Sequence, residues 1–174
     1  MFTHDTQAGV IHEGPVRYLM MRPDVLMGIA RELPAEHVGT FFTAFEKSAF
    51  RHSRRSFELY QAAGRFGTDD FLARTAEVAA TLGWGSWSVT NLGGGAREIR
   101  VDGSPFAAGF GSASHPVCAA ISGVLRAIAL TGYGADAEVK EVACAAHVGG
   151  RECRFLLMPR TASESVRAAW SEEE

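Results

Sequence analysis

The three cysteines constrain this chain more than any other feature, because all of them lie in the last third of its 174 residues. Cys118 stands early in a segment with helical periodicity, whereas Cys144 and Cys153 flank the turn at Gly149-Gly150. A hairpin built on that turn brings the two later thiols together. The odd number, with no secretory leader pattern and no apolar run of membrane-spanning length, argues against a secreted disulfide framework. We expect a cytoplasmic protein with free or metal-bound thiols and no membrane span.

The composition is that of an ordinary folded protein, with 47% hydrophobic and 21% charged residues. A domain of this length buries roughly 70% of the surface of its unfolded chain, so a core can form without covalent cross-links. The net charge of −3 gives no general attraction for phosphate backbones, and we expect no direct binding of nucleic acid. No internal repeat or Pro/Gly/Ser-rich linker divides the sequence. These observations predict one domain over residues 1–174, with frayed ends.

Hydrophobic periodicity predicts both helices and strands. Strands are expected at 16–21, 84–92, 96–101, 137–147 and 152–158, and helices at 23–33, 41–60, 68–82 and 114–130. In the first helix, Leu26, Ile29, Ala30 and Leu33 follow the spacing of one buried face. Glycine turns join the second and third strands and the last two strands, which indicates two hairpins. The order of elements predicts an α+β fold with an antiparallel sheet packed against several helices.

Three thiols suggest a metal site, because zinc prefers four tetrahedral ligands drawn from thiolate, imidazole and carboxylate. One further donor is then needed, and spacing alone does not choose among the nearby candidates, which are Glu138, Glu141, His147 and His115. Two other interpretations stay open. In one, the thiols are small buried hydrophobic groups. In the other, Cys144 and Cys153 form a disulfide, which a reducing compartment disfavours.

Three short segments carry a resemblance to a known family: Pro116-Val117-Cys118, Glu141-Val142-Ala143-Cys144 and Gly149-Gly150-Arg151-Glu152-Cys153-Arg154-Phe155. They resemble the 4-vinyl reductase domain family, which is related to sensor domains of phenol-responsive activators and to TRAPP vesicle-tethering subunits. The resemblance implies a TRAPP-like ligand-binding fold. In the aromatic-sensing members a helix cysteine, Glu-x-x-Cys and Cys-x-Phe together bind zinc. Carried over to this chain, the implied zinc ligands are Cys118, Glu141, Cys144 and Cys153.

The implied ligand set raises a geometric difficulty. Alternate residues of a regular strand face opposite sides, so Glu141 and Cys144 can reach one metal only through a bulge or bend. Glu138 would share a face with Cys144 and is the alternative ligand. Four protein ligands leave no open coordination position, so the metal is expected to be structural. The net charge of −2 on such a site would favour nearby N–H donors or cations, and Lys140, Arg151 and Arg154 are close in sequence.

The aromatic residues suggest where a ligand would bind. They could line an apolar pocket or form ordinary core, and we name them only as a region: Phe41, Phe42, Phe45, Phe50, Phe57, Tyr60, Trp84 and Trp87. No motif supports catalysis, since Ser114-His115 lacks a Gly-x-Ser-x-Gly context and Gly93-Gly94-Gly95 lacks the dinucleotide fingerprint. We therefore predict no catalytic residue.

The sequence and the resemblance together predict a stand-alone domain that binds a small hydrophobic or aromatic molecule, contains structural zinc and has a sensory or regulatory role. The resemblance also implies a homodimer. Two alternatives remain. One is an accessory protein or reductase of tetrapyrrole (bacteriochlorophyll) synthesis, as the family name implies, and the other is a dimeric scaffold for protein interactions.

Overall fold

The computed structural model describes residues 2–62, 71–134 and 137–160. The predicted frayed ends and the predicted start of the third helix at Thr68 lie outside them, and the single domain over residues 1–174 stays a prediction. Along the chain the elements are β1 (Thr3–Asp5), β2 (Val10–Glu13), β3 (Val16–Tyr18), α1 (Pro23–Glu32), α2 (Ala35–Ala62), α3 (Phe71–Thr81), β4 (Ser86–Gly93), β5 (Ala96–Asp102), α4 (Pro105–Phe110), α5 (Ala119–Tyr133), β6 (Ala137–Ala143), α6 (Ala145–Val148) and β7 (Glu152–Pro159).

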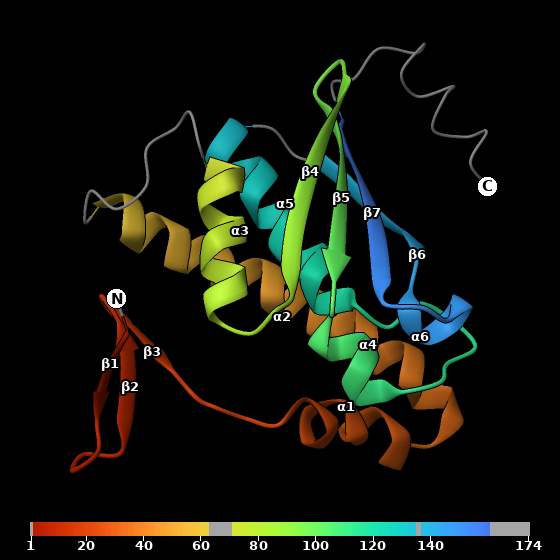
Figure 1. The fold of residues 1–174 in the computed structure, drawn as a ribbon, viewed down its shortest axis with the longest axis horizontal. Helices are drawn as coiled ribbons and strands as arrows, with labels where there is room; N and C mark the ends of the chain where they lie inside the picture. Colours follow the sequence, from red (N-terminus) through yellow and green to blue (C-terminus); the bar gives the residue numbers. More distant parts are fainter. Residues whose placement is uncertain (1, 63–70, 135–136, 161–174) are drawn as a thin grey trace.

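The main sheet has four antiparallel strands in the order β4-β5-β7-β6. The last strand in the chain, β7, is therefore an inner strand, and its Phe155, Leu156 and Leu157 are buried. Figure 1 shows α5 and α2 behind this sheet and α3 beside β4. This arrangement confirms the predicted α+β fold, in which an antiparallel sheet packs against helices.

Helices α2 and α5 pack unusually closely where they cross at Gly123. A Cβ atom at this position would overlap the backbone oxygen of Glu46 on α2. Beside this contact, Arg126 Nη1 lies 2.9 Å from Glu46 Oε1, and the same guanidinium lies over the ring of Phe50. A glycine is thus required at the crossing. Neither α2 nor any other helix within the described residues is long and apolar enough to cross a membrane.

The N-terminal strands form a second, three-stranded antiparallel sheet in the order β1-β2-β3, which lies apart from the main sheet in Figure 1. The Tyr18 hydroxyl lies 2.7 Å from that of Tyr60 and connects this small sheet to α2. The sequence predicted a single strand at 16–21. That strand ends at Tyr18, and the next residues, including Leu19 and Met20, are exposed in the segment leading to α1.

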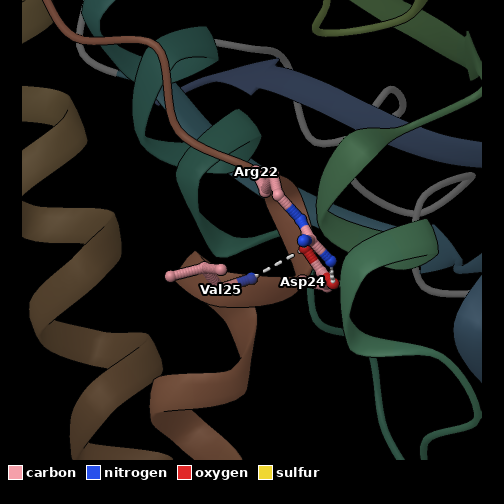
Figure 2. A network of polar contacts seen from close by, with 3 residues as sticks. All are labelled: Arg22, Asp24 and Val25. Carbon is pink, nitrogen blue, oxygen red and sulfur yellow. Dashed lines mark hydrogen bonds and ion pairs between the residues drawn. The ribbon is translucent and has the colours of Figure 1, made fainter.

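Helix α1 begins at Pro23, as the sequence predicted. Figure 2 shows its first turn, where Asp24 Oδ1 accepts hydrogen bonds from Arg22 Nε and from the backbone N–H of Val25, both at 3.0 Å. A carboxylate at this end of a helix is favoured by the helix dipole. The neighbouring arginine adds a charged hydrogen bond, so polar contacts of adjacent residues define where the helix starts.

The predicted buried face of α1 is wrong in part. Ile29 is 48% exposed, whereas Met27 and Ala30 are buried. The helix packs on α4, and the approach is close because a Cβ atom at Gly109 would lie 2.5 Å from the backbone of Pro23. Since α4 was not predicted, no local pattern indicated which side of α1 it would cover.

Two other elements differ from the prediction. Helix α5 begins at Ala119 rather than 114, because Pro116 disfavours a helical conformation at the residue before it. Residues 144–147 were predicted as strand, but Cys144 caps the short helix α6, which two helix-favouring alanines begin and Gly149 ends with a φ of 83°. The missed helix α4 has its own signal in Ser104-Pro105, since Ser104 Oγ accepts a hydrogen bond from the N–H of Ala107.

Candidate metal centre

Four side chains from three separate segments meet at one end of the main sheet. Cys118 is the N-cap residue of α5, Glu141 lies on β6, Cys144 follows β6 directly, and Cys153 lies on β7. Their potential ligand atoms all lie within 4.8 Å of one another. The structure therefore brings together the four residues that the family resemblance implies.

The three thiols are free and completely buried. Cys118 Sγ lies 3.7 Å from Cys153 Sγ and 4.0 Å from Cys144 Sγ. A disulfide bond would require a separation of about 2.05 Å. The thiols are thus close without being bonded, which is the spacing that a shared metal ion requires of its donors.

A β-bulge explains how Glu141 and Cys144 face the same point. Glu141 pairs with Phe155, but Ala143 pairs with Arg154, so the register slips by one residue at Val142. One extra residue reverses the alternation of side chains. The bulge or bend that the ligand set required is present, and Cys144 then lies just beyond the strand.

The other candidate ligands lie outside this group. Glu138 is exposed on β6. His147 Nδ1 lies 3.3 Å from the backbone oxygen of Ala113, and the ring of His115 packs edge-on against Phe42. Among the described residues, the group that could hold a metal thus has Glu141 as its fourth member.

Backbone N–H groups, rather than the basic side chains that the sequence suggested, contact the four side chains. The N–H of Cys118 donates to Glu141 Oε2 at 3.0 Å, and the N–H of Ala145 donates to Cys153 Sγ at 3.3 Å. Ser104 Oγ lies 3.3 Å from Cys118 Sγ. In contrast, the guanidinium groups of two predicted neighbours pair with carboxylates elsewhere, Arg151 with Asp102 and Arg154 with Glu98.

Sequence reasoning missed the roles of Ser104 and Ala145. The Ser-Pro pair at the start of α4 was a detectable N-cap signal, but nothing in the sequence places that cap beside Cys118. The Ala145 contact depends on backbone geometry, which a side chain does not encode.

Crowding four acidic groups shifts their pKa values in different directions. Hydrogen bonds with Cys144 and Cys153, together with burial, raise the pKa of the Cys118 thiol. The same thiols and the N–H of Ala145 stabilise the thiolate of Cys153 and lower its pKa to about 4. Burial and the negative charge of Cys144 raise the pKa of Glu141 to about 8. The group resists full ionisation unless a positive charge joins it.

The residues fit a bound cation by a separate criterion. Glu141 Oε1 is buried and has no hydrogen-bond partner among the described residues, although its companion oxygen has one. Burying such an acceptor unpaired is costly, so it needs an explanation. A cation held by three sulfur atoms and this oxygen would provide one. The cluster of three cysteines and one glutamate could therefore hold a metal ion.

The predicted aromatic region contains a second buried group, which we call the aromatic cluster: Phe42, Phe45, Trp84, Phe106 and Phe110. Phe106 contacts Trp84 and Phe45 edge to face, with ring centroids 4.9 and 5.7 Å apart, and Phe110 contacts Phe42. Each ring thus meets another ring at a favourable separation. The cluster is packed from side chains of α2, α4 and the residues before β4.

The fold is that of vinyl-4-reductase and TRAPP-like proteins. The chain is similar to the phenol-responsive sensory domain of the transcription activator PoxR, solved with phenol, at a TM-score of 0.74 and 19% identity over 99% of this chain and 92% of that one. It is also similar to a trafficking protein particle complex subunit 3 from Naegleria fowleri covalently bound to palmitic acid, at a TM-score of 0.55 and 17% identity over 80% and 96%.

Residues 97–159 match the family model of the vinyl-4-reductase domain, and the predicted resemblance to the 4-vinyl reductase family is confirmed. A vinyl-4-reductase family protein from Methanocaldococcus jannaschii is similar at a TM-score of 0.50 and 17% identity, over 82% of this chain and 97% of that one. No curated protein matches the chain. The matched segment contains all four side chains of the candidate metal centre.

Proposed function

We propose that this protein is a small-molecule sensor domain whose fold is tied together by one zinc ion. The observation that carries the proposal is the buried set of three thiols and one carboxylate, with ligand atoms within 4.8 Å of one another. The likeness to the PoxR sensory domain supports a ligand-sensing domain in general. A cytoplasmic, homodimeric state completes the proposal.

Zinc suits the donor set because thiolate ligands favour soft or borderline metals over magnesium and calcium. Cys118, Glu141, Cys144 and Cys153 would hold it, and no ligand position would remain for water or substrate. The ion would join the start of α5 to β6 and β7. Its role would be to fix these three segments and to balance the charge of the four ligands, and no chemical step is assigned to it.

The ligand class follows from apolar surroundings with a few polar groups. On α5, Thr131 Oγ1 is buried and has no hydrogen-bond partner among the described residues. The next residue, Gly132, is in close contact with the ring of Phe71, which packs edge-on against Phe57. An unpaired hydroxyl beside aromatic rings suits a small aromatic ligand that carries a hydroxyl group.

A covalent fatty acid, as in the Naegleria subunit, suits this chain less well. If that bond were a thioester, it would require a cysteine, and the sequence has only three. All three lie in the candidate metal centre. Acylation of one would remove a metal ligand, so a non-covalent ligand is the better fit.

The test is to measure metal content and ligand binding on the same preparation. Native mass spectrometry should show one zinc per chain in protein purified without chelator, and a metal-free, stable protein would contradict the site. Quenching of Trp84 and Trp87 should report phenol binding. Thr131→Val should weaken phenol binding while leaving binding of toluene unchanged, because only phenol can use the hydroxyl. Binding of a tetrapyrrole, but not phenol, would favour the tetrapyrrole-related alternative.

The scaffold alternative is favoured by one specific observation. Large apolar side chains are exposed along one continuous stretch of chain, the segment before α1 and the outer side of that helix: Leu19, Met20, Met21, Val25 and Ile29. Contiguous apolar surface often marks an interaction site. Light scattering of the full chain and of a Met20→Lys variant would test this role. A dimer that the variant disrupts, with no response to any aromatic compound, would support the scaffold.

A further inference from the structure

A hollow on the surface lies outside the aromatic cluster. Its volume is about 420 Å³, and its walls come from the turn after β5, from α4 and from α6 with the turn that follows it. A volume of this size lies within the range of sites for small molecules. Its lining residues include no phenylalanine, tyrosine or tryptophan, so it is a separate feature from the proposed site for an aromatic ligand.

The hollow is open because small residues form its walls. Eight of its twelve lining residues are glycine or alanine, and Ala107 and Ala146 supply two of its methyl groups. The glycines at 103, 111, 149 and 150 all have positive φ values, so the backbone turns themselves require them. The alanines have no such requirement, and a larger side chain on α4 at Ala108 would fill the space.

Positively charged and hydrogen-bonding groups surround the hollow. Arg151 and His147 line it. Arg31 stacks on Phe110, and its Nη2 lies 3.1 Å from the position of a Cβ atom at Gly111, which places a second guanidinium at the rim. The carboxylate of Asp102 lies 3.4 Å from Arg151 Nη2, and both of these side chains are largely exposed. The described groups at the rim therefore favour a negatively charged ligand.

The wall of the hollow is shared with the candidate metal centre. Ser104 lines the hollow, and its Oγ lies 3.3 Å from Cys118 Sγ. Ala145 also lines the hollow, and its N–H donates to Cys153 Sγ. A molecule bound here would touch two residues that hold the sulfur atoms in place.

We propose that this hollow binds a small organic anion, with its carboxylate at Arg151 and His147 and its apolar body against the alanine methyl groups. A guanidinium recognises a carboxylate through charge-assisted hydrogen bonds, and an aliphatic wall excludes water from the remainder of the molecule. The binding site is independent of the aromatic ligand site proposed above. Its occupant and the metal influence each other through Ser104 and Ala145.

Titration of the full-length protein with benzoate, followed by amide NMR, tests this proposal. The four glycine amides at 103, 111, 149 and 150 should shift in a saturable way, with a dissociation constant on the order of 1 mM. Arg151→Gln should weaken binding about tenfold, because it removes the charged partner. Arg55→Gln on α2, whose side chain is also exposed and also paired with a glutamate, is the matched control and should have no effect.

Filling the hollow provides a second test that does not depend on charge. Ala108→Phe should abolish the benzoate shifts, whereas Ala80→Phe, at an exposed position on α3, should leave them unchanged. Equal binding of neutral benzyl alcohol would overturn the assignment to anions, and equal binding of inorganic phosphate would overturn the role of the alanine wall. Shifts that survive Ala108→Phe, or no shifts at all in a folded protein that retains its metal, would overturn the site.

Discussion

The metal centre and the aromatic cluster are both buried, but they are built on opposite principles. In the aromatic cluster every ring meets another ring, and the contact of Phe106 with Trp84 is satisfied by the two side chains alone. In the metal centre, three buried thiols surround a carboxylate whose Oε1 has no partner among the described residues. One cluster is complete with the atoms of the chain, whereas the other requires a positive charge from outside.

This difference shows that burial alone does not measure how well a region is stabilised. Apolar rings gain free energy when they leave water and need nothing further. Ionisable groups lose hydration when they are buried, and this cost is recovered only through a counter-charge or hydrogen bonds. The two clusters should therefore respond differently to metal removal, to truncation and to pH.

The largest effect is expected from the loss of the metal. Structural zinc contributes about 10–16 kcal/mol of apparent binding free energy in small zinc domains, so chelation should strongly lower the melting temperature. Hydrogen exchange should increase first in β6, in β7 and at the start of α5. Calorimetry with and without chelator, together with metal analysis, measures the effect.

Cys153→Ser is the matched variant for this experiment. It should lower metal content and melting temperature together, and chelator should then change neither value further. If the variant kept a full equivalent of zinc, Cys153 would not be a ligand.

Truncation of the aromatic cluster should have the next largest effect. Phe106→Ala removes a buried ring with two aromatic neighbours and should lower the free energy of unfolding by about 3–5 kcal/mol. Zinc stoichiometry should remain unchanged, because no ligand is lost. Denaturant unfolding with parallel metal analysis tests both points, and Phe106→Leu should cost much less. Loss of metal from Phe106→Ala in the folded protein would show that the clusters are not independent.

The crossing of α2 and α5 links the two clusters. Gly123→Ala would place a methyl group against the α2 backbone and should destabilise the protein by about 1–3 kcal/mol. Because α5 begins next to Cys118 and α2 carries Phe42, both hydrogen exchange at the metal centre and tryptophan emission should change. Gly39→Ala is the control, since its site on α2 is open and alanine favours a helix by up to about 1 kcal/mol.

The smallest effect is a pH dependence of the metal-free protein. Burial raises the pKa of Glu141 to about 8 in the folded state, from 4.5 ordinarily. The unfolded chain therefore loses this proton first, and the contribution of Glu141 to stability should be complete below pH 4.5 and be lost as pH rises through 8. Glu141→Gln should remove this decline, as measured by denaturant titrations at several pH values.

The same substitution should have the opposite consequence when metal is present. Glutamine lacks the negative charge of the fourth ligand, so Glu141→Gln should release zinc to a competing chelator more readily. Glu138→Gln, exposed on the same strand, should change neither property. An unchanged rate of zinc release would remove Glu141 from the ligand set.

Local patterns predicted most of the elements but not how they meet. Pro23 marked the start of α1 correctly, and the glycine turns marked both hairpins. The buried side of α1 was wrong because it depends on α4, which lies far away in the sequence. The two first strands were missed, since short strands in a small sheet carry little periodicity.

The chemistry that this protein can offer is readable from its residues alone: three thiols at a fixed spacing, one carboxylate three residues before the second, and a glycine turn between the last two strands. Which carboxylate joins the thiols depended on the folded chain. The bulge at Val142 turns Glu141 inward and leaves Glu138 exposed. Side-chain identity is local, whereas the direction of a side chain depends on register and on neighbours that folding brings from distant parts of the chain.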